Sequence, residues 1–383
     1  MNKNLENNRS AQLMIALLAV NGIGRKTFVN ISKRVVDLNV SWDDFWRKKP
    51  AQIWQQCGLN SRQQQGLKRF KKRFTPEAYI GWIEEQSIDL ITNEDKRYPK
   101  YLQKIDDKPL VLYAKGSLLG VNQRPIAVVG TRRISGYGRL VCERIIPELV
   151  ASQATIISGF MYGVDTYAHQ QALLHNGYTV GVLGYGFNHL YPVENKNFFA
   201  EMLAQGNGFI TEYAPWITGQ KGNFPERNRI VAGMSLATVV IEAAQRSGSH
   251  ITARFAGEYG RGVCAVPGSI TNPYSEGTKW LINQGARLVS SGREILEEAG
   301  VFGSGWSKII PDEVDVNQLS FSDAMQQRIY QYLLNQPLST DDLAKQLKIA
   351  IPDLNMALSL LELEGHLQKQ NEIWFIKNSN GVQ

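Results

Sequence analysis

Loops that combine glycine with Ser, Thr and Arg recur between residues 130 and 250. The first loop contains Gly130, Thr131, Arg132 and Ser135, the second begins at Ser158-Gly159, and a third reads Arg246-Ser247-Gly248. Backbone amides and hydroxyls in such loops bind phosphate oxygens, and the planar guanidinium of arginine matches a phosphate through paired hydrogen bonds. These loops therefore predict a site for a phosphorylated ligand.

A further stretch adds an aromatic ring to this chemistry. Residues 221–229 place Lys221, Arg227 and Arg229 around Phe224, with Asn228 between the two arginines. Stacking side chains among phosphate-binding cations are typical of a groove for single-stranded nucleic acid. The alternative is a solvated loop with a buried Phe224. The neighbouring Gly/Ser/Arg loops favour the nucleic-acid interpretation.

Two pairs of residues could serve catalysis. Asp165 and His169 stand four positions apart on one helical face, as an acid/base pair would. We favour the structural alternative, in which Asp165 caps a helix that opens at Gly163 and His169 packs behind it. Glu212 and Glu242 each follow a predicted strand. Either they polarise water, or they bind loop amides and nearby arginines.

Cofactor and metal sites have no clear signature. The loop at residue 130 is not a Gly-x-Gly-x-x-Gly fingerprint, and no Walker-type Gly-Lys-Ser/Thr loop occurs. Cys57, Cys142 and Cys264 are too widely spaced to predict a zinc cluster or a disulfide framework. We expect no catalytic residues, no cofactor and no metal.

Short apolar runs place the glycine-rich loops at the ends of predicted strands. Helix-length segments separate the runs, which indicates parallel strands joined by crossover helices. We therefore predict a doubly wound, Rossmann-like α/β sheet of about seven strands over residues 79–300. Ligands bind such sheets outside the carboxyl ends of the strands, where these loops begin. The expected strands are 126–129, 155–157, 179–183, 209–211, 237–241, 263–266 and 287–289.

The charge is concentrated at the N-terminal end. Residues 1–75 hold 15 Lys and Arg against 4 Asp and Glu, while residues 76–300 hold 21 of each. We predict a helical domain over residues 1–78, SAM-like or helix-hairpin-helix-like, with its turn at Gly22-Ile23-Gly24. Its excess charge fits a polyanion-binding module or a solvated surface equally well.

The C-terminal end has the opposite charge. Residues 301–320 read as a linker, and residues 321–383 as a winged-helix domain with a final hairpin at 367–370 and 373–376. Residues 301–383 hold 6 Lys and Arg against 10 Asp and Glu, and the third helix, 351–363, has no Lys or Arg. We interpret this domain as a protein-contact module. No apolar run reaches the ~18 residues of a membrane span, so we expect a cytoplasmic protein without membrane contact.

The motifs, read in order, resemble those of the DprA/Smf family of bacterial DNA-processing proteins. The resemblance covers residues 90–296 and is more general in the flanking modules. Two departures are visible: Val193 stands where a lysine usually follows Tyr-Pro, although Lys196 could replace its charge, and Tyr162 stands near a usual cation position, where it could stack instead. The matching segments are 129–135, 158–169, 191–195, 224–233, 246–253 and 267–286.

The resemblance implies a non-enzymatic protein that binds single-stranded DNA without sequence preference. Family members protect incoming strands during natural transformation, load the RecA recombinase onto them, and form homodimers through the α/β domain. Arg132 and Arg229 would hold phosphates, loop amides near Ser158 and Gly159 would cradle another, and Phe224 would support a base. The predicted site comprises Gly130, Thr131, Arg132, Ser135, Ser158, Gly159, Lys221, Phe224, Arg227, Asn228, Arg229, Arg246, Ser247 and Gly248.

Two alternatives stay open at this point. A Rossmann-like nucleoside-monophosphate phosphoribohydrolase also uses a Gly-Ser/Thr-Arg turn, but it needs a Pro-Gly-Gly-x-Gly-Thr-x-x-Glu loop. Here the corresponding loop has Glu242 before it and Arg246 within it. The other alternative is a regulator that binds duplex DNA through the winged helix, and the acidic charge of that domain argues against it.

Overall fold

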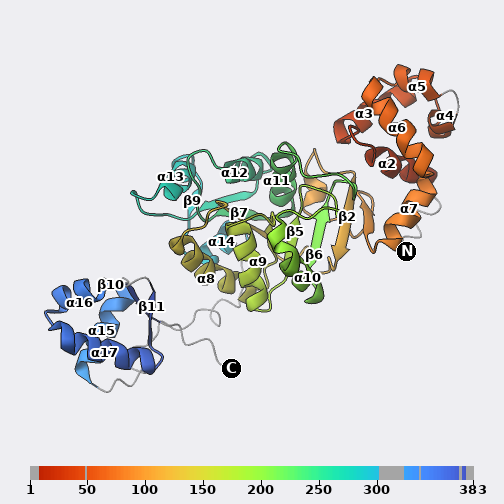
Figure 1. Cartoon of the computed structure of the whole chain (residues 1–383). Helices are drawn as coiled ribbons and strands as arrows, with labels where there is room; N and C mark the ends of the chain where they lie inside the picture. The colour runs from red at the N-terminus through yellow and green to blue at the C-terminus, as the bar shows by residue number, and fades with distance from the viewer. Residues whose placement is uncertain (1–7, 48–49, 302–322, 336–337, 371–372, 377–383) are drawn as a thin grey trace. The chain divides into compact units, whose positions relative to one another are not determined.

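The computed structural model describes residues 8–47, 50–301, 323–335, 338–370 and 373–376. The chain forms two compact units, Met1–Ser304 and Gly305–Gln383, and the predicted linker lies almost entirely outside the described residues. The larger unit holds the N-terminal helices and the main sheet (Figure 1).

The N-terminal part is helical, as predicted, and extends beyond residue 78. Its last helix begins at Pro76, is capped by the Thr75 hydroxyl, and ends at Glu85. Asn60 and Gln63 form a reciprocal capping box that starts the basic helix α6. Leu13, Leu17 and other buried apolar side chains form the core. The helices are α2 (Arg9–Leu18), α3 (Arg25–Asp37), α4 (Trp42–Arg47), α5 (Pro50–Gln56), α6 (Ser61–Arg73) and α7 (Pro76–Glu85).

The main sheet contains nine strands in the order β1-β2-β6-β5-β4-β3-β7-β8-β9. The seven predicted strands are β3 to β9, and they pair in parallel. Sequence reasoning missed β1 and β2, which extend one edge in antiparallel pairing. The strands are β1 (Asp89–Thr92), β2 (Val111–Gly116), β3 (Ile126–Val129), β4 (Ile156–Ser158), β5 (Thr179–Val182), β6 (Gly208–Thr211), β7 (Ala237–Val240), β8 (Gly262–Ala265) and β9 (Arg287–Leu288).

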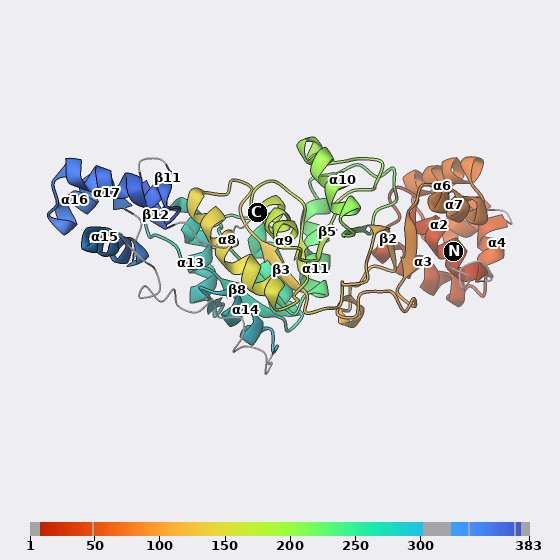
Figure 2. The same ribbon diagram turned by 90° about the horizontal axis from the view of Figure 1, so that it is seen from below.

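Helices cover both faces of this sheet (Figures 1 and 2). One face carries α8 (Gly136–Ala151), α9 (Val164–Leu174), α10 (Lys196–Ala204) and α14 (Gly292–Glu298); the other carries α11 (Asn223–Met234), α12 (Ser249–Glu258) and α13 (Glu276–Asn283). Every residue of strands β3 to β7 is buried, as expected for strands that are covered on both faces. From β3 the chain adds β4, β5 and β6 on one side and then returns to add β7 on the other side of β3. The carboxyl ends of β3 and its neighbours therefore form the switch point of the sheet. Short 3-10 turns occupy Leu102–Lys104, Val193–Asn195 and Pro273–Ser275.

The smaller unit has the predicted winged-helix pattern. Ser339 caps α16 by accepting a hydrogen bond from the Asp342 amide. Ile329, Leu343, Leu358 and Trp374 are buried in its core. Its elements are α15 (Ala324–Asn335), β10 (Leu338–Ser339), α16 (Thr340–Leu347), α17 (Ile351–Leu363), β11 (Leu367–Gln370) and β12 (Ile373–Ile376), with strand order β10-β12-β11.

Two further findings bear on the sequence predictions. Cys57, Cys142 and Cys264 are buried and unpaired. Across the described ranges, every helix is too short or too polar to cross a membrane.

Candidate nucleic-acid interface

Four side chains from separate segments form a continuous surface beyond the carboxyl ends of β3, β4 and β5. The Arg132 guanidinium lies 5.9 Å from the centre of the Phe224 ring. The Phe224 ring lies 5.7 Å from that of Tyr191, which lies 6.2 Å from that of Tyr162. Tyr191 is 41% exposed and Tyr162 is 37% exposed. We call these three rings, with Arg132 at one end, the aromatic row.

The backbone around the row holds the rings in place. Gly184 and Gly219 flank Phe224, and a Cβ atom at either position would stand 3.0 Å from the ring. Only glycine leaves room for the phenyl group there without displacing it. The Tyr185 hydroxyl donates to the Tyr191 carbonyl at 2.5 Å, and the Tyr162 hydroxyl donates to Glu194 at 2.6 Å. Bases can stack on rings fixed in this way while a phosphate pairs with exposed Arg132.

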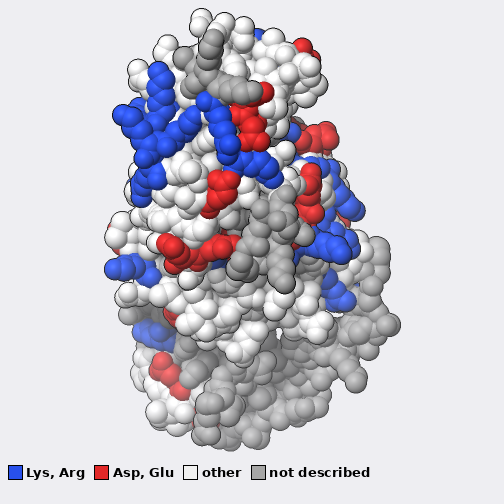
Figure 3. Space-filling model, turned by 90° about the vertical axis from the view of Figure 1, so that its right-hand side faces the viewer, with Lys and Arg blue, Asp and Glu red and all other residues white. Residues whose placement is uncertain are grey.

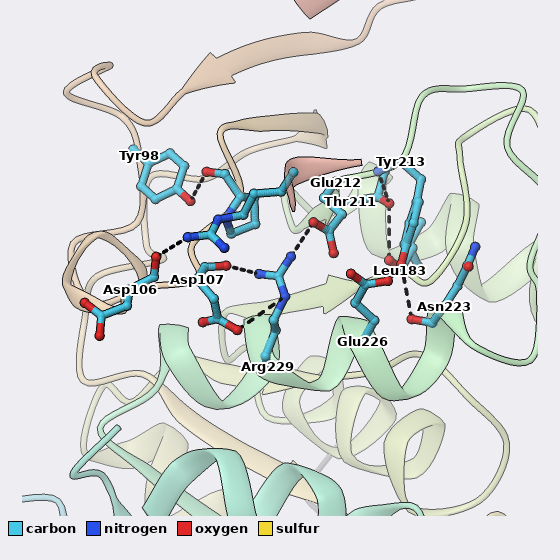
Figure 4. Close-up of polar contacts among 12 residues, drawn as sticks. Tyr98, Asp106, Asp107, Leu183, Thr211, Glu212, Tyr213, Asn223, Glu226 and Arg229 are labelled. Atoms are coloured by element: carbon cyan, nitrogen blue, oxygen red, sulfur yellow. Dashed lines mark hydrogen bonds and ion pairs between the residues drawn. The ribbon is translucent and has the colours of Figure 1, made fainter. Parts of the chain in front are cut away.

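Arg229 does not belong to this surface. Its guanidinium donates to the Asp107 carbonyl at 2.7 Å and pairs with the Glu212 carboxylate (Figure 4). Its side chain is 6% exposed. Burial raises the pKa of Glu212 to about 7, and Arg229 acts in the opposite direction. We therefore correct the predicted role of Arg229: it joins segments of the protein instead of facing a DNA phosphate.

Arg227 is also an internal group. It is buried, donates to the Gly159 carbonyl at 2.5 Å, and contacts the Val182 carbonyl. Ser158 is buried too, with its hydroxyl bonded to the Val128 carbonyl at 2.6 Å. Arg227 thus stabilises the loop at Gly159. Because the side chains of Arg227 and Ser158 are both buried, the prediction that they contact DNA directly is wrong.

The N-terminus of α8 is occupied by the protein's own carboxylate. Glu242, buried at the end of β7, accepts hydrogen bonds from the Ser135 amide at 2.9 Å and from the Ser135 hydroxyl at 2.5 Å. The Glu242 carbonyl also accepts from the Thr131 amide at 2.8 Å. A carboxylate here takes the place that a phosphate would take at a helix N-terminus. Ser135 and the Thr131 amide therefore shape the loop, and they leave Arg132 and Arg133 exposed beside half-buried Gly130.

The remaining predicted residues lie on or near the surface. Lys221, Arg246 and Gly248 are exposed, and Ser247 is half-buried with its hydroxyl 2.8 Å from that of Ser249. Asn228 is half-buried and donates to the Gly248 carbonyl at 3.3 Å, which links α11 to the loop after β7. The structure thus keeps Lys221 and Arg246 available to a ligand, while Asn228 makes a contact within the protein.

The acid/base pair considered above is structural. His169 is buried and its Nδ1 lies 2.6 Å from the Thr179 hydroxyl. Burial, with a smaller effect of Arg227, lowers the pKa of His169 to about 3, so the ring is neutral. Asp165 accepts from the Met161 amide at 3.4 Å instead of capping the helix amides, and burial raises its pKa to about 6. Glu212 pairs with Arg229, and Glu242 binds the Ser135 amide. Both therefore fit the interpretation in which they bind nearby arginines and loop amides.

Sequence reasoning missed Tyr191 as a site residue. Its Tyr-Pro motif was visible, but its position against Phe224 depends on the loop after β5 returning toward α11. Tyr162 departs from the family pattern, and the sequence suggests that it could stack, but it is not among the predicted site residues. Both rings become recognisable as functional candidates once their exposure and mutual distance are known.

The fold and this surface define the class of the protein: a Rossmann-like sheet with an exposed aromatic and cationic surface, followed by a winged-helix domain. The family model for DNA recombination-mediator protein A matches residues 89–313, and the model for the DprA winged helix domain matches residues 318–371. The chain belongs to the DprA/Smf family.

Individual relatives agree with this assignment. Protein Smf of Escherichia coli is 40% identical over 277 residues, covering 70% of this chain and 72% of that protein. DNA processing protein DprA of Bacillus subtilis is 38% identical over 235 residues, covering 61% and 79%. The crystal structure of DprA from Streptococcus pneumoniae superposes with a TM-score of 0.63 at 32% identity, covering 75% of this chain and 97% of that one.

Proposed function

We propose that this protein binds single-stranded DNA without sequence preference through the aromatic row and Arg132. The observation that carries the proposal is the contiguous row of two exposed tyrosine rings and the half-buried Phe224 ring, which ends at the exposed guanidinium of Arg132. Every base has a face that can stack, so such a surface tolerates any sequence. A duplex keeps its bases stacked on each other and cannot use these rings in the same way.

We also propose, from the family resemblance, that the bound strand is protected and passed to the RecA recombinase, and that the protein acts as a cytoplasmic homodimer. The proposal includes no catalytic step. Glu242, the acid nearest the first loop, is buried and hydrogen-bonded to Ser135, which does not favour a phosphoribohydrolase. Helix α17 exposes Met356, Leu360 and Leu363, which favours protein contact over duplex reading.

Fluorescence anisotropy with a labelled oligo(dT) and a matching duplex, over a salt series, tests the DNA-binding proposal. Each phosphate contact contributes about 0.7 to the log–log salt slope for a single strand. We expect preference for the single strand, and we expect Arg132→Ala to lower the slope by about that amount. Arg133→Ala, an exposed neighbour outside the row, is the matched control. Equal binding of both DNA forms, unchanged in Arg132→Ala, would refute the proposal.

A further inference from the structure

A second candidate site lies where helix α6 meets the turn after α2 and the loop between β6 and α11. It is a cavity of about 410 Å³, lined in part by Asn21, Arg62, Arg69, Arg73 and Trp216. Ligand pockets have volumes of about 300 to 1,000 Å³. None of these residues belongs to the aromatic row, so the cavity is a separate feature of the larger unit.

Three arginines of α6 share the face that lines the cavity. Positions 62, 66, 69 and 73 are spaced by four, three and four residues, which aligns them along one side of a helix. Gly66 lets α6 approach the turn after α2, because a Cβ there would stand 3.0 Å from a Val20 methyl group. Arg62, Arg69 and Arg73 are exposed, and within the described part of the chain no carboxylate pairs with them. These arginines are therefore available to bind an anionic ligand.

Part of the cavity lining is aromatic. Trp216 and Phe74 stack with ring centres 6.1 Å apart and planes 10° from parallel. The Arg73 guanidinium lies 4.8 Å from the centre of Phe74 and 5.8 Å from that of Trp216. The Trp216 indole donates to the Ala19 carbonyl at 3.2 Å, which fixes the ring. A flat, partly cationic wall of this kind suits a nucleic-acid base.

The surroundings are strongly basic. Helix α6 also carries Lys68, Lys71 and Lys72 and contains no acidic residue. Figure 3, which views the molecule from the side of the N-terminal helices, shows Lys and Arg side chains gathered over that part. A positive surface of this extent raises the local concentration of polyanions. It favours a phosphate-bearing ligand over a neutral one.

We propose that this cavity binds a nucleoside phosphate, with its phosphate on Arg62 and Arg69 and its base against Arg73 and Trp216. The ligand is either a free nucleotide or one unit of a DNA strand. The proposal goes beyond strand binding by the aromatic row and does not rest on it. Trp216 lies on the loop before α11 and Phe224 in the first turn of that helix. The eight residues that separate them span at most about 29 Å at 3.3 to 3.6 Å per residue, so one strand could reach both sites.

Two probes distinguish a DNA strand from a free nucleotide as the ligand of the cavity. The full-length protein is titrated with labelled oligo(dT) by anisotropy over a salt series, and with dTMP by calorimetry. The test variant is Arg62→Gln/Arg69→Gln, which removes both proposed phosphate ligands. Its matched control is Lys68→Gln/Lys72→Gln, which removes the same charge from exposed positions of α6 outside the cavity lining. Arg132→Ala is measured in parallel as a variant of the aromatic row.

For a strand ligand, we expect the test variant to bind oligo(dT) about tenfold more weakly at low salt, with a salt slope lower by about 1.4 for two lost phosphate contacts. The control should change the slope by less than half of that. For a free nucleotide, dTMP binding should disappear in the test variant alone. Equal effects in test and control variants, or no effect with either probe, would overturn the proposal. Loss of strand binding in the test variant but not in Arg132→Ala would support ligand binding by the cavity and would refute strand binding by the aromatic row.

Discussion

Replacing Arg229 by methionine should destabilise the protein without removing its affinity for DNA. The side chains of Arg229 and Glu212 are 6% and 12% exposed, and Oε1 of Glu212 has no hydrogen-bond partner within the described residues. Removing the cation leaves a buried carboxylate unpaired, which costs about 3 to 5 kcal/mol. For a unit of about 300 residues, whose unfolding entropy is roughly 0.6 kcal/mol/K, this loss corresponds to a Tm lower by roughly 6 °C.

The pH dependence gives the prediction a sign. Arg229 lowers the pKa of Glu212, whereas burial raises it. Without Arg229, the folded-state pKa of Glu212 rises further above its unfolded value. As the pH rises, Glu212 ionises in the unfolded chain before it ionises in the folded protein, so the variant loses stability. The destabilisation should therefore be larger at pH 8 than at pH 5. Glu212→Gln added to Arg229→Met should remove this difference and recover part of the Tm.

Thermal unfolding of both variants, with anisotropy at a temperature where they are folded, checks these expectations. Arg229→Met should bind oligo(dT) within about twofold of the unmodified protein, whereas Arg132→Met should keep its Tm and lose affinity. An Arg229→Met protein with an unchanged Tm and weakened strand binding would show that Arg229 contacts DNA, and it would refute the structural role argued above.

Three further predictions follow from the site. Tyr191→Ala should weaken oligo(dT) binding by about 1 to 3 kcal/mol with an unchanged salt slope, because it removes stacking and no charge; anisotropy showing a changed slope would contradict this. Glu242→Ala should lower the free energy of unfolding by about 2 to 4 kcal/mol, because the Ser135 amide and hydroxyl lose their acceptor; a loss below about 0.5 kcal/mol in denaturant titration would count against it. His169 has a pKa lowered to about 3, so stability falls with pH below about 6.5, where only the unfolded chain takes up the proton. Relative to His169→Gln, the unmodified protein should lose up to about 1.4 kcal/mol per pH unit between pH 6 and pH 4.5, and parallel curves would rule this out.

Much of the fold could be predicted from local sequence patterns. Strands β3 to β9 are short apolar runs separated by helices, and their periodicity is unambiguous. Helix α17 and the hairpin of β11 and β12 were predicted with the bounds that the structure has. Strands β1 and β2 were missed because Asp89–Thr92 and Val111–Gly116 are joined by a long irregular segment, without the crossover helix that marks the others.

The site was harder because burial is not visible in the residue types. Arg132 and Arg229 look alike in sequence, yet one is exposed and the other pairs with Glu212. The partners that occupy the buried groups are distant in sequence: Glu242 binds Ser135, and Gly159 binds Arg227. A single sequence carries no record of these pairings. The sequence could indicate which loops meet, but not which of their side chains make contacts within the protein and which are free to bind a ligand.

We propose above that single-stranded DNA lies on Tyr162, Tyr191 and Phe224. Photo-crosslinking of the full-length protein to an oligonucleotide containing 5-iodouracil, followed by mass spectrometry of the peptides, tests it most directly. We expect crosslinks to Tyr191 and Phe224, which are lost when unlabelled single strand is added in excess. Crosslinks confined to the N-terminal helices or to the winged-helix unit would contradict it.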